Sequence, residues 1–191
     1  MIRKICFLDW DDTLLFTSFI KYHHLDDNVL YGYLAILDDL LILLYIKLVT
    51  YYVIYVVTNA DYDWVILSCK KYLPKLAEFI SFNKINIISA KDADINVEYR
   101  KLNTFKDIML DFIINWGMPT EILSVGDSDY EHNAALAMHE IYRVNTKILK
   151  MIVNPLPDEL INQLRLFFSC VDKIEQDNRF KLILNIGYRP D

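Results

Sequence analysis

Three segments of the sequence hold polar side chains in a pattern that could bind a metal ion. Residues 7–14 read FLDWDDTL, residues 56–59 read VVTN, and residues 124–131 read SVGDSDYE, so each segment is an apolar run that ends in small or acidic residues. Several carboxylates gathered in one place repel one another unless a cation neutralises them. Carboxylate oxygens favour a hard ion, and Mg²⁺ is the usual choice in phosphate chemistry. The pattern therefore predicts a magnesium site, provided that the fold brings the three segments together.

The elements that would position these residues alternate along the chain. Short β-branched or apolar runs predict strands over residues 2–8, 51–57, 85–88, 122–125 and 141–144. Helical patterns lie between them, over residues 28–48, 63–79, 105–116 and 131–138, with a kink or break expected at Pro74. A polar stretch over residues 91–103 is expected to be irregular. After Pro155 and Pro157 the pattern predicts an amphipathic helix over residues 158–170, then an edge strand over residues 180–186.

Alternating strands and helices predict an α/β fold with a mostly parallel sheet of about five strands, covered on both faces in a Rossmann-like three-layer α/β/α arrangement. Ligands bind such sheets beyond the carboxyl ends of the strands, so the polar residues after the first, second and fourth strands should converge. With no repeat or linker, we expect one domain over residues 1–191, in which residues 155–191 form a C-terminal extension. The predicted elements leave no room for a large cap domain.

The three segments together resemble the haloacid dehalogenase superfamily. The resemblance rests on DxDxT followed by Leu, a Thr that ends a strand, a downstream Lys, and GDxxx(D/E), in the order and spacing found between Asp9 and Glu131. Residues 8–15, 56–68 and 72–76 are also similar to a little-characterised, mainly protist branch. Phe16 and Asp63 depart from the Pro and Gly expected in that branch, and Glu131 stands where the superfamily more often has Asp.

The resemblance implies a role for each matching residue. Asp9 would attack phosphorus and form an aspartyl-phosphate, and Asp11 would protonate the leaving group and then activate water. Thr58 and Asn59 would donate hydrogen bonds to phosphoryl oxygens. The resemblance places Mg²⁺ between Asp9, the backbone carbonyl of Asp11, and Asp127, with Glu131 as a second acidic contact.

A lysine should neutralise charge in the transition state, and three are candidates. Lys106, near the expected start of a helix, fits the family's placement best. Lys91 follows the third strand directly, and Lys101 is the third choice.

Other polar and aromatic residues near these motifs have simpler interpretations. Trp10 lies between two catalytic positions, so we expect it to contact substrate at the site entrance, whereas Trp64 is more typical of a core or interface. Asp12 and Asp129 are interpreted as solvated turn or helix-capping residues, and Ser128 as a cap. His132 is expected on a helix surface.

The substrate expectation follows from the missing cap and the charge. Without a lid to exclude water, an open site suits a large substrate, and the net charge of −6 favours a phosphoprotein over phosphorylated nucleic-acid ends. Small phosphate esters or nucleotides stay open as alternatives, since oligomerisation could replace a lid. A catalytically silent regulatory binding protein on the same fold is a further alternative.

Composition narrows the class of protein. With 191 residues, 54% hydrophobic and 24% charged, the chain is typical of one packed globular domain. Three cysteines without metal-ligand spacing favour a reducing, cytoplasmic compartment. Residues 40–57 are apolar enough to suggest a membrane span, but Lys47 and the change from Leu-rich to Tyr/Val-rich sequence favour a buried helix running into a buried strand.

Overall fold

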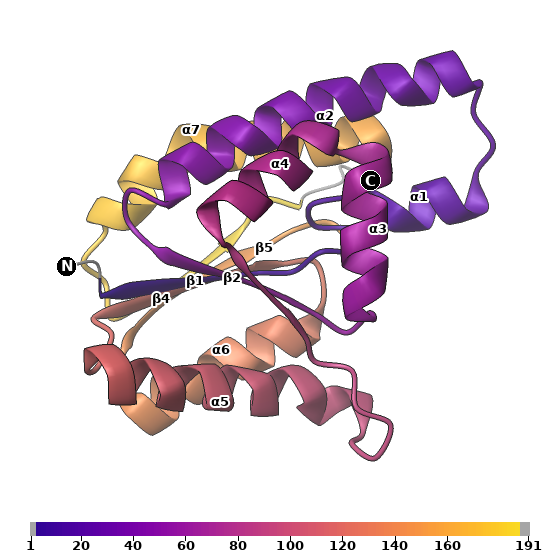
Figure 1. Ribbon diagram of the computed structural model, residues 1–191. Helices are drawn as coiled ribbons and strands as arrows, with labels where there is room; N and C mark the ends of the chain where they lie inside the picture. Colours follow the sequence, from indigo (N-terminus) through magenta and orange to yellow (C-terminus); the bar gives the residue numbers. More distant parts are fainter. Residues whose placement is uncertain (1–2, 188–191) are drawn as a thin grey trace.

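Six parallel strands form the central sheet of the protein, seen in a computed structural model that describes residues 3–187 (Figure 1). The sheet order is β3-β2-β1-β4-β5-β6. In chain order the strands are β1 (Lys4–Leu8), β2 (Val53–Thr58), β3 (Asn86–Ser89), β4 (Glu121–Gly126), β5 (Asn145–Lys150) and β6 (Lys181–Asn185). The predicted α/β class with a Rossmann-like three-layer arrangement is confirmed, and the predicted edge strand brings the sheet to six.

Helices cover both faces of this sheet (Figure 1). One layer holds α2 (Asp27–Leu48), α3 (Tyr62–Tyr72), α4 (Pro74–Asn83) and α7 (Pro157–Gln176), and the other holds α5 (Val97–Trp116) and α6 (Asp129–Tyr142). The short helix α1 (Thr17–Tyr22) follows the turn after β1. Neighbouring side chains of β1 pack against opposite helix layers, because side chains alternate in direction along a strand. Leu8 packs toward α2 and α7, and the Phe7 ring stacks on Phe105 of α5 with centroids 3.9 Å apart.

The chain changes direction across the sheet between β1 and β4. From β1 it moves outward through β2 to β3, then returns to the other side of β1 and continues through β4, β5 and β6. The loops after β1 and β4 therefore lead away from each other, which opens a crevice at their carboxyl ends. Asp9 and Asp127 lie in these two loops, so the topology places them together.

The predicted element boundaries are mostly close to those observed, with two exceptions. Helix α5 begins at Val97 rather than 105, because the Asn96 side chain accepts a hydrogen bond from the Glu98 backbone N–H and caps the helix in the stretch expected to be irregular. Residues 141–144 are not a strand, since α6 continues to Tyr142 and ends at Arg143 in a left-handed conformation. The first residue of the predicted first strand, Ile2, lies outside the described residues.

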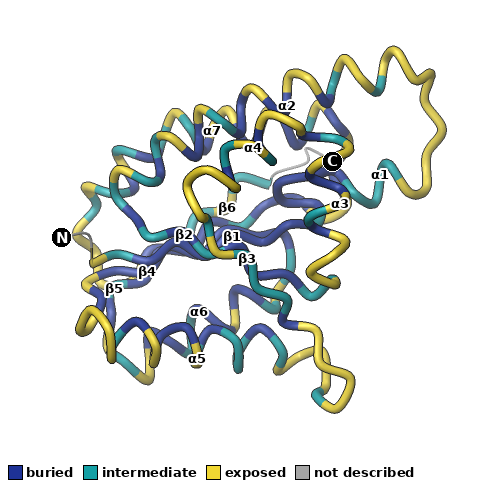
Figure 2. The backbone as a smooth tube through the Cα atoms, viewed as in Figure 1, coloured by how far each residue is buried: buried dark blue, intermediate teal, exposed yellow. Residues whose placement is uncertain are grey.

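Helix α2 contains the first part of the apolar stretch that suggested a membrane span, residues 40–48. Among residues 3–187 it is the one helix long and apolar enough to cross a membrane by length and composition. In the fold its buried side chains recur at helical spacing, from Leu34 through Leu41 to Leu48, and pack into the core shared with α4 and α7. The apolar stretch divides into this helix and β2, as the sequence predicts. The N-terminal part of α2 and the loop before it are exposed (Figure 2).

The described chain carries no separate cap domain at either usual point of insertion. Residues 14–57 form the turn after β1, α1, α2 and most of β2, and residues 59–100 form α3, α4, β3 and the start of α5. The carboxyl edge of the sheet is therefore bordered by short loops and by α1 and α3.

Two adjacent acidic residues of α2, Asp38 and Asp39, allow a test of which contacts hold the start of α4 after the break at Pro74. Asp38 is 2% exposed and accepts hydrogen bonds from the backbone N–H groups of Lys75 and Leu76, both at 2.9 Å. Asp38→Ala should lower the free energy of unfolding by about 2–3 kcal/mol, because it leaves two helix N-terminal donors without partners. Asp39→Ala is the matched control, since Asp39 forms an exposed pair with Lys75 that solvent screens. Urea unfolding that shows equal losses for both variants would contradict this role of Asp38.

Candidate active site

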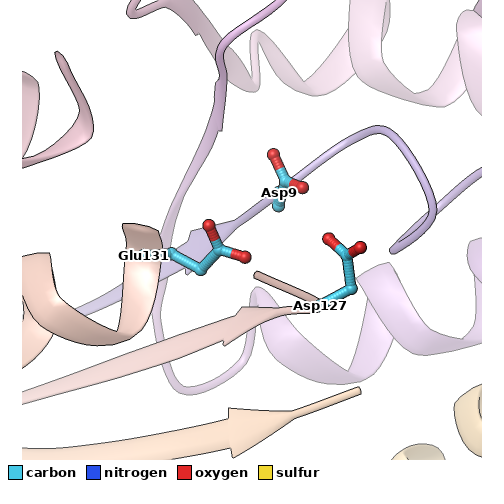
Figure 3. A group of neighbouring side chains, drawn as sticks. All are labelled: Asp9, Asp127 and Glu131. Carbon is cyan, nitrogen blue, oxygen red and sulfur yellow. The ribbon is translucent and has the colours of Figure 1, made fainter. Parts of the chain in front are cut away.

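Three buried carboxylates meet at the carboxyl edge of the sheet, between β1 and β4 (Figure 3). Asp9 follows β1 directly, and its backbone N–H donates to the Val125 carbonyl at 3.0 Å, which fixes it against β4. Asp127 follows the last residue of β4, and Glu131 projects from the first turn of α6. Each offers an oxygen atom within 4.8 Å of the others. The structure thus brings together three of the residues expected at the metal site.

Lys101 of α5 joins this cluster from the helix layer that also holds α6. Its Nζ atom lies 2.6 Å from Asp9 Oδ1 and 2.9 Å from Glu131 Oε2, with a side chain that is 2% exposed. The lysine that contacts Asp9 is therefore Lys101, the third choice from the sequence, and not Lys106, the first. Lys106 lies five residues later and about 140° around the helix, and within residues 3–187 no hydrogen bond or ion pair joins it to the cluster. Lys91 is also excluded from this position, because it is exposed and pairs with Asp61 at 2.7 Å.

Glu131 holds Lys101 in place through a fixed conformation of its own. Its Oε1 accepts from the Ser128 backbone N–H at 2.7 Å and its Oε2 from the Ser128 hydroxyl at 2.6 Å, so it completes the capping box of α6. The side chain passes over Gly126, where an added Cβ would lie 2.2 Å from Oε1. Both oxygens of Glu131 therefore already have donors, and its contribution to a metal site stays a prediction.

Burial and mutual repulsion set the protonation of the cluster. Burial raises the pKa of Asp9 to about 7 against the opposing charge of Lys101, and it raises the pKa of Asp127 to about 8, with Asp9 and Glu131 adding to the effect. Burial opposes the charge of Lys101, but Asp9 and Glu131 outweigh it and raise the lysine's pKa. Burial likewise acts to raise the pKa of Glu131, but Lys101 and Ser128 outweigh it and lower that pKa. The Lys101–Glu131 pair is thus charged, whereas the raised pKa values of Asp9 and Asp127 favour their protonated forms, and a bound cation would favour their ionised forms.

The donor set fits a hard divalent cation. Asp127 has no hydrogen bond or ion pair within the described residues, although it is only 8% exposed and faces Asp9. Two neighbouring carboxylates, which offer oxygen atoms only, are the kind of protein ligands that Mg²⁺ prefers. Asp9 and Asp127 are the residues that would hold such an ion. The backbone carbonyl of Asp11 as a further ligand stays a prediction.

Asp11 lies outside the carboxylate cluster and is held by Trp64, which the sequence predicts to be a core or interface residue. Its Oδ1 accepts a hydrogen bond from Nε1 of Trp64 at 2.9 Å. Trp64 is in the first turn of α3, shortly after Thr58 and Asn59. The position of Trp64 in the sequence could have predicted this contact, because a helix that begins at the carboxyl end of β2 starts at the same sheet edge as Asp11.

Thr58 and Asn59 end β2 at the same edge. Thr58 is buried, and its Oγ1 accepts from the Ala60 backbone N–H at 3.0 Å, which leaves its own hydroxyl proton free to donate. Asn59 is half-buried, and its Oδ1 is a buried acceptor without a donor among the described residues. Thr58 can therefore donate a hydrogen bond to a ligand at this edge, and the Asn59 Oδ1 can accept one.

Trp10 does not line the entrance, so that prediction is wrong. Its side chain is fully buried, and its Nε1 donates to the Ser68 hydroxyl at 3.1 Å. The turn after Asp9 directs this ring into the core under α3, because the alternating strand direction carries Asp9 and Trp10 to different sides. Trp10 anchors the loop that carries Asp9 and Asp11 and cannot contact a substrate.

The remaining polar residues near the motifs divide between caps and surface. Asp12 accepts from the backbone N–H and the hydroxyl of Ser18, so it caps α1, but it is buried rather than solvated as expected. Ser128 caps α6 as predicted. Asp129 is exposed and pairs with Lys150 at 2.6 Å. His132 is buried rather than on the surface, with Nδ1 3.1 Å from the Ser128 carbonyl oxygen.

Comparison of the chain with protein-family models, with curated proteins and with solved structures gave no match.

Two glycine substitutions, one in strand β4 and one in helix α2, test how closely Glu131 packs against Gly126. Gly126→Ala should lower the free energy of unfolding by about 1–3 kcal/mol, because the new methyl group overlaps the Glu131 carboxylate and displaces it. Gly32→Ala is the control, since nothing lies within 4 Å of its Cβ position in α2, and it should stabilise the protein by about 0.5–1 kcal/mol. Thermal or urea unfolding measures both changes, and a neutral Gly126→Ala would contradict the close packing of Glu131.

Proposed function

We propose that the protein is a Mg²⁺-dependent phosphomonoester hydrolase with Asp9 as its nucleophile. The observation that carries this proposal is the contact of Asp9 with the buried Lys101 ammonium, at 2.6 Å, beside the unpaired carboxylate of Asp127. A carboxylate held by a lysine at the end of a central strand is oriented for attack on phosphorus, and the positive charge offsets that of an incoming phosphate. The resemblance of residues 7–14, 56–59 and 124–131 to the haloacid dehalogenase superfamily supports the same chemistry.

The reaction would proceed in two displacements at phosphorus. In the first, an Asp9 oxygen forms a bond to phosphorus, the bond from phosphorus to the ester oxygen breaks, and Asp11 gives its proton to that leaving oxygen. In the second, Asp11 takes a proton from water, the hydroxyl oxygen attacks phosphorus, and the bond to Asp9 breaks to release inorganic phosphate. Asp11 is returned to its protonated form, and Asp9 to its carboxylate.

The surrounding residues would stabilise charge that develops on the phosphoryl oxygens. Thr58 has a hydroxyl proton to donate, Asn59 has an amide, and Lys101 keeps a positive charge beside the nucleophile. Glu131 acts on the reaction through Lys101, as a positioning residue. Mg²⁺, held by Asp9 and Asp127, would neutralise phosphate charge and orient the ester.

The substrate class follows from the borders of the site. Because the described chain has no cap domain over the carboxyl edge, the site would remain open to an ester carried on a larger molecule. With a net charge of −6, the protein is poorly suited to a nucleic-acid backbone. We therefore propose a phosphoprotein substrate.

Hydrolysis of p-nitrophenyl phosphate tests the nucleophile. Wild-type protein should release p-nitrophenol with Mg²⁺ and lose this activity with EDTA, and Asp9→Asn should reduce kcat by about 10³-fold or more because an amide cannot form the intermediate. Asp129→Asn is the control, since Asp129 is an exposed acid that pairs with Lys150, and its kcat should stay within twofold of wild type. Undiminished turnover by a folded Asp9→Asn variant would exclude the mechanism.

A pair of α5 variants tests which lysine supports the reaction. Lys101→Met should lower kcat by about 10²–10³-fold, because it removes the positive charge beside Asp9. Lys106→Met should leave kcat within twofold. Circular dichroism of both variants checks the fold, since breaking a buried ion pair also destabilises the protein. The opposite ranking of the two variants would restore Lys106 as the active-site lysine.

A further inference from the structure

A cavity of about 620 Å³ opens at Asp11, between α1 and α3. The two helices lie next to each other at the carboxyl edge of the sheet, past the loop that carries Asp11 (Figure 1). The residues that define its chemistry are Asp11, Ile20, Lys21, Tyr22, Trp64 and Tyr72. Its volume is in the range of sites that bind small molecules or a few peptide side chains.

The position of Asp11 relates this cavity to the reaction. Under the proposed function, Asp11 protonates the leaving oxygen, which must therefore come within hydrogen-bond distance of its carboxylate. Asp11 lines the cavity, whereas Asp9, Asp127 and Glu131 do not. An ester with its phosphate at Asp9 would direct its leaving group past Asp11, into this space.

Three aromatic rings line the cavity. The Trp64 indole N–H donates to Asp11 Oδ1 at 2.9 Å, so the edge of one ring lies one hydrogen bond from the proton donor. Tyr72, from the end of α3, and Tyr22, from the end of α1, add two further rings. Aromatic rings favour offset-stacked or edge-to-face contacts with another ring. A flexible aliphatic leaving group would make none of these contacts.

We propose that this cavity binds the leaving group and selects phosphate monoesters whose ester oxygen is attached directly to an aromatic ring, as in the phosphotyrosine side chain of a protein. The inference rests on the proposed function. A nucleoside monophosphate carries its ring beyond a sugar, so the sugar rather than the ring would lie next to Asp11. Lys21 is the one other charged residue that lines the cavity, which suits a neutral or acidic peptide segment around the tyrosine.

Non-hydrolysable phosphonates test the cavity separately from catalysis. In benzylphosphonate a CH₂ group replaces the ester oxygen of an aryl phosphate, and cyclohexylmethylphosphonate is the same size without the aromatic ring. Isothermal titration calorimetry of wild-type protein with Mg²⁺ should give a Kd about tenfold lower for benzylphosphonate. The phosphonate analogue of adenosine 5′-monophosphate should bind at least tenfold more weakly than benzylphosphonate.

Variants of the two tyrosines test whether the cavity causes the preference for benzylphosphonate over cyclohexylmethylphosphonate. Tyr22→Leu/Tyr72→Leu keeps apolar bulk and removes two rings, so the tenfold preference should fall to twofold or less. Tyr22→Leu alone affects a residue that is 69% exposed, and it should reduce the preference while preserving the fold if the double variant is unstable. Phe82→Leu, at an exposed ring in the separate groove between α2 and α4, should leave the preference unchanged.

The outcomes separate this inference from the proposed function. Equal affinities for the two matched phosphonates, a preference that survives loss of both tyrosines, tighter binding of the nucleotide analogue, or no binding of benzylphosphonate would each overturn the aryl-selective cavity. Selective binding without turnover of p-nitrophenyl phosphate would support the cavity and overturn the hydrolase. Turnover of p-nitrophenyl phosphate without selective binding would support the hydrolase and overturn the aryl-selective cavity.

Discussion

The ammonium group of Lys101 lies between two buried carboxylates, and the geometry of the site depends on this contact. Removing a charge from water is costly unless a partner is held close to it, so Lys101 keeps Asp9 and Glu131 in fixed positions. Glu131 is itself fixed by Ser128 and by the space over Gly126. The cap of α6, the end of β4 and the second turn of α5 thus act together to orient one carboxylate at the end of β1.

The sheet topology explains why the cluster forms at this position. The β1–β4 crevice is where the two halves of the sheet diverge, so loops leave room there for side chains from both strands. Burial is the main cause of the raised pKa values of Asp9 and Asp127, even with the Lys101 ammonium beside Asp9. A divalent cation held by these two carboxylates would offset the cost of ionising them.

Two tryptophans near the site serve different purposes. Trp10 is buried under α3 and bonds to Ser68, so it anchors the loop between Asp9 and Asp11 from inside the core. Trp64 is partly exposed and bonds to Asp11 from the outside. Asp11 is therefore held between a rigid loop and an aromatic wall, and the cavity between α1 and α3 begins at that wall.

Much of the fold could be predicted because it depends on local patterns. Apolar runs that end in polar residues identified β1, β2 and β4, and parallel strands bring their carboxyl ends to one edge, so the convergence of Asp9, Thr58 and Asp127 followed. Pro74 correctly marked the break between α3 and α4. The sequence did not predict the Asn96 cap of α5 or the contact of Lys101 with Asp9, because a helix that starts at Val97 presents Lys101 rather than Lys106 to the sheet.

The sequence by itself determined the α/β class, the parallel sheet, and the carboxylates at its edge, since these depend on the period of side chains along strands and on strand ends. Tertiary structure alone decided which lysine reaches Asp9, which tryptophan is buried, and that α1 and α3 enclose a cavity beside Asp11. Those outcomes depend on where a helix begins and which face it packs. Such choices are set by contacts between residues far apart in the chain, such as Trp64 with Asp11 and Lys101 with Asp9.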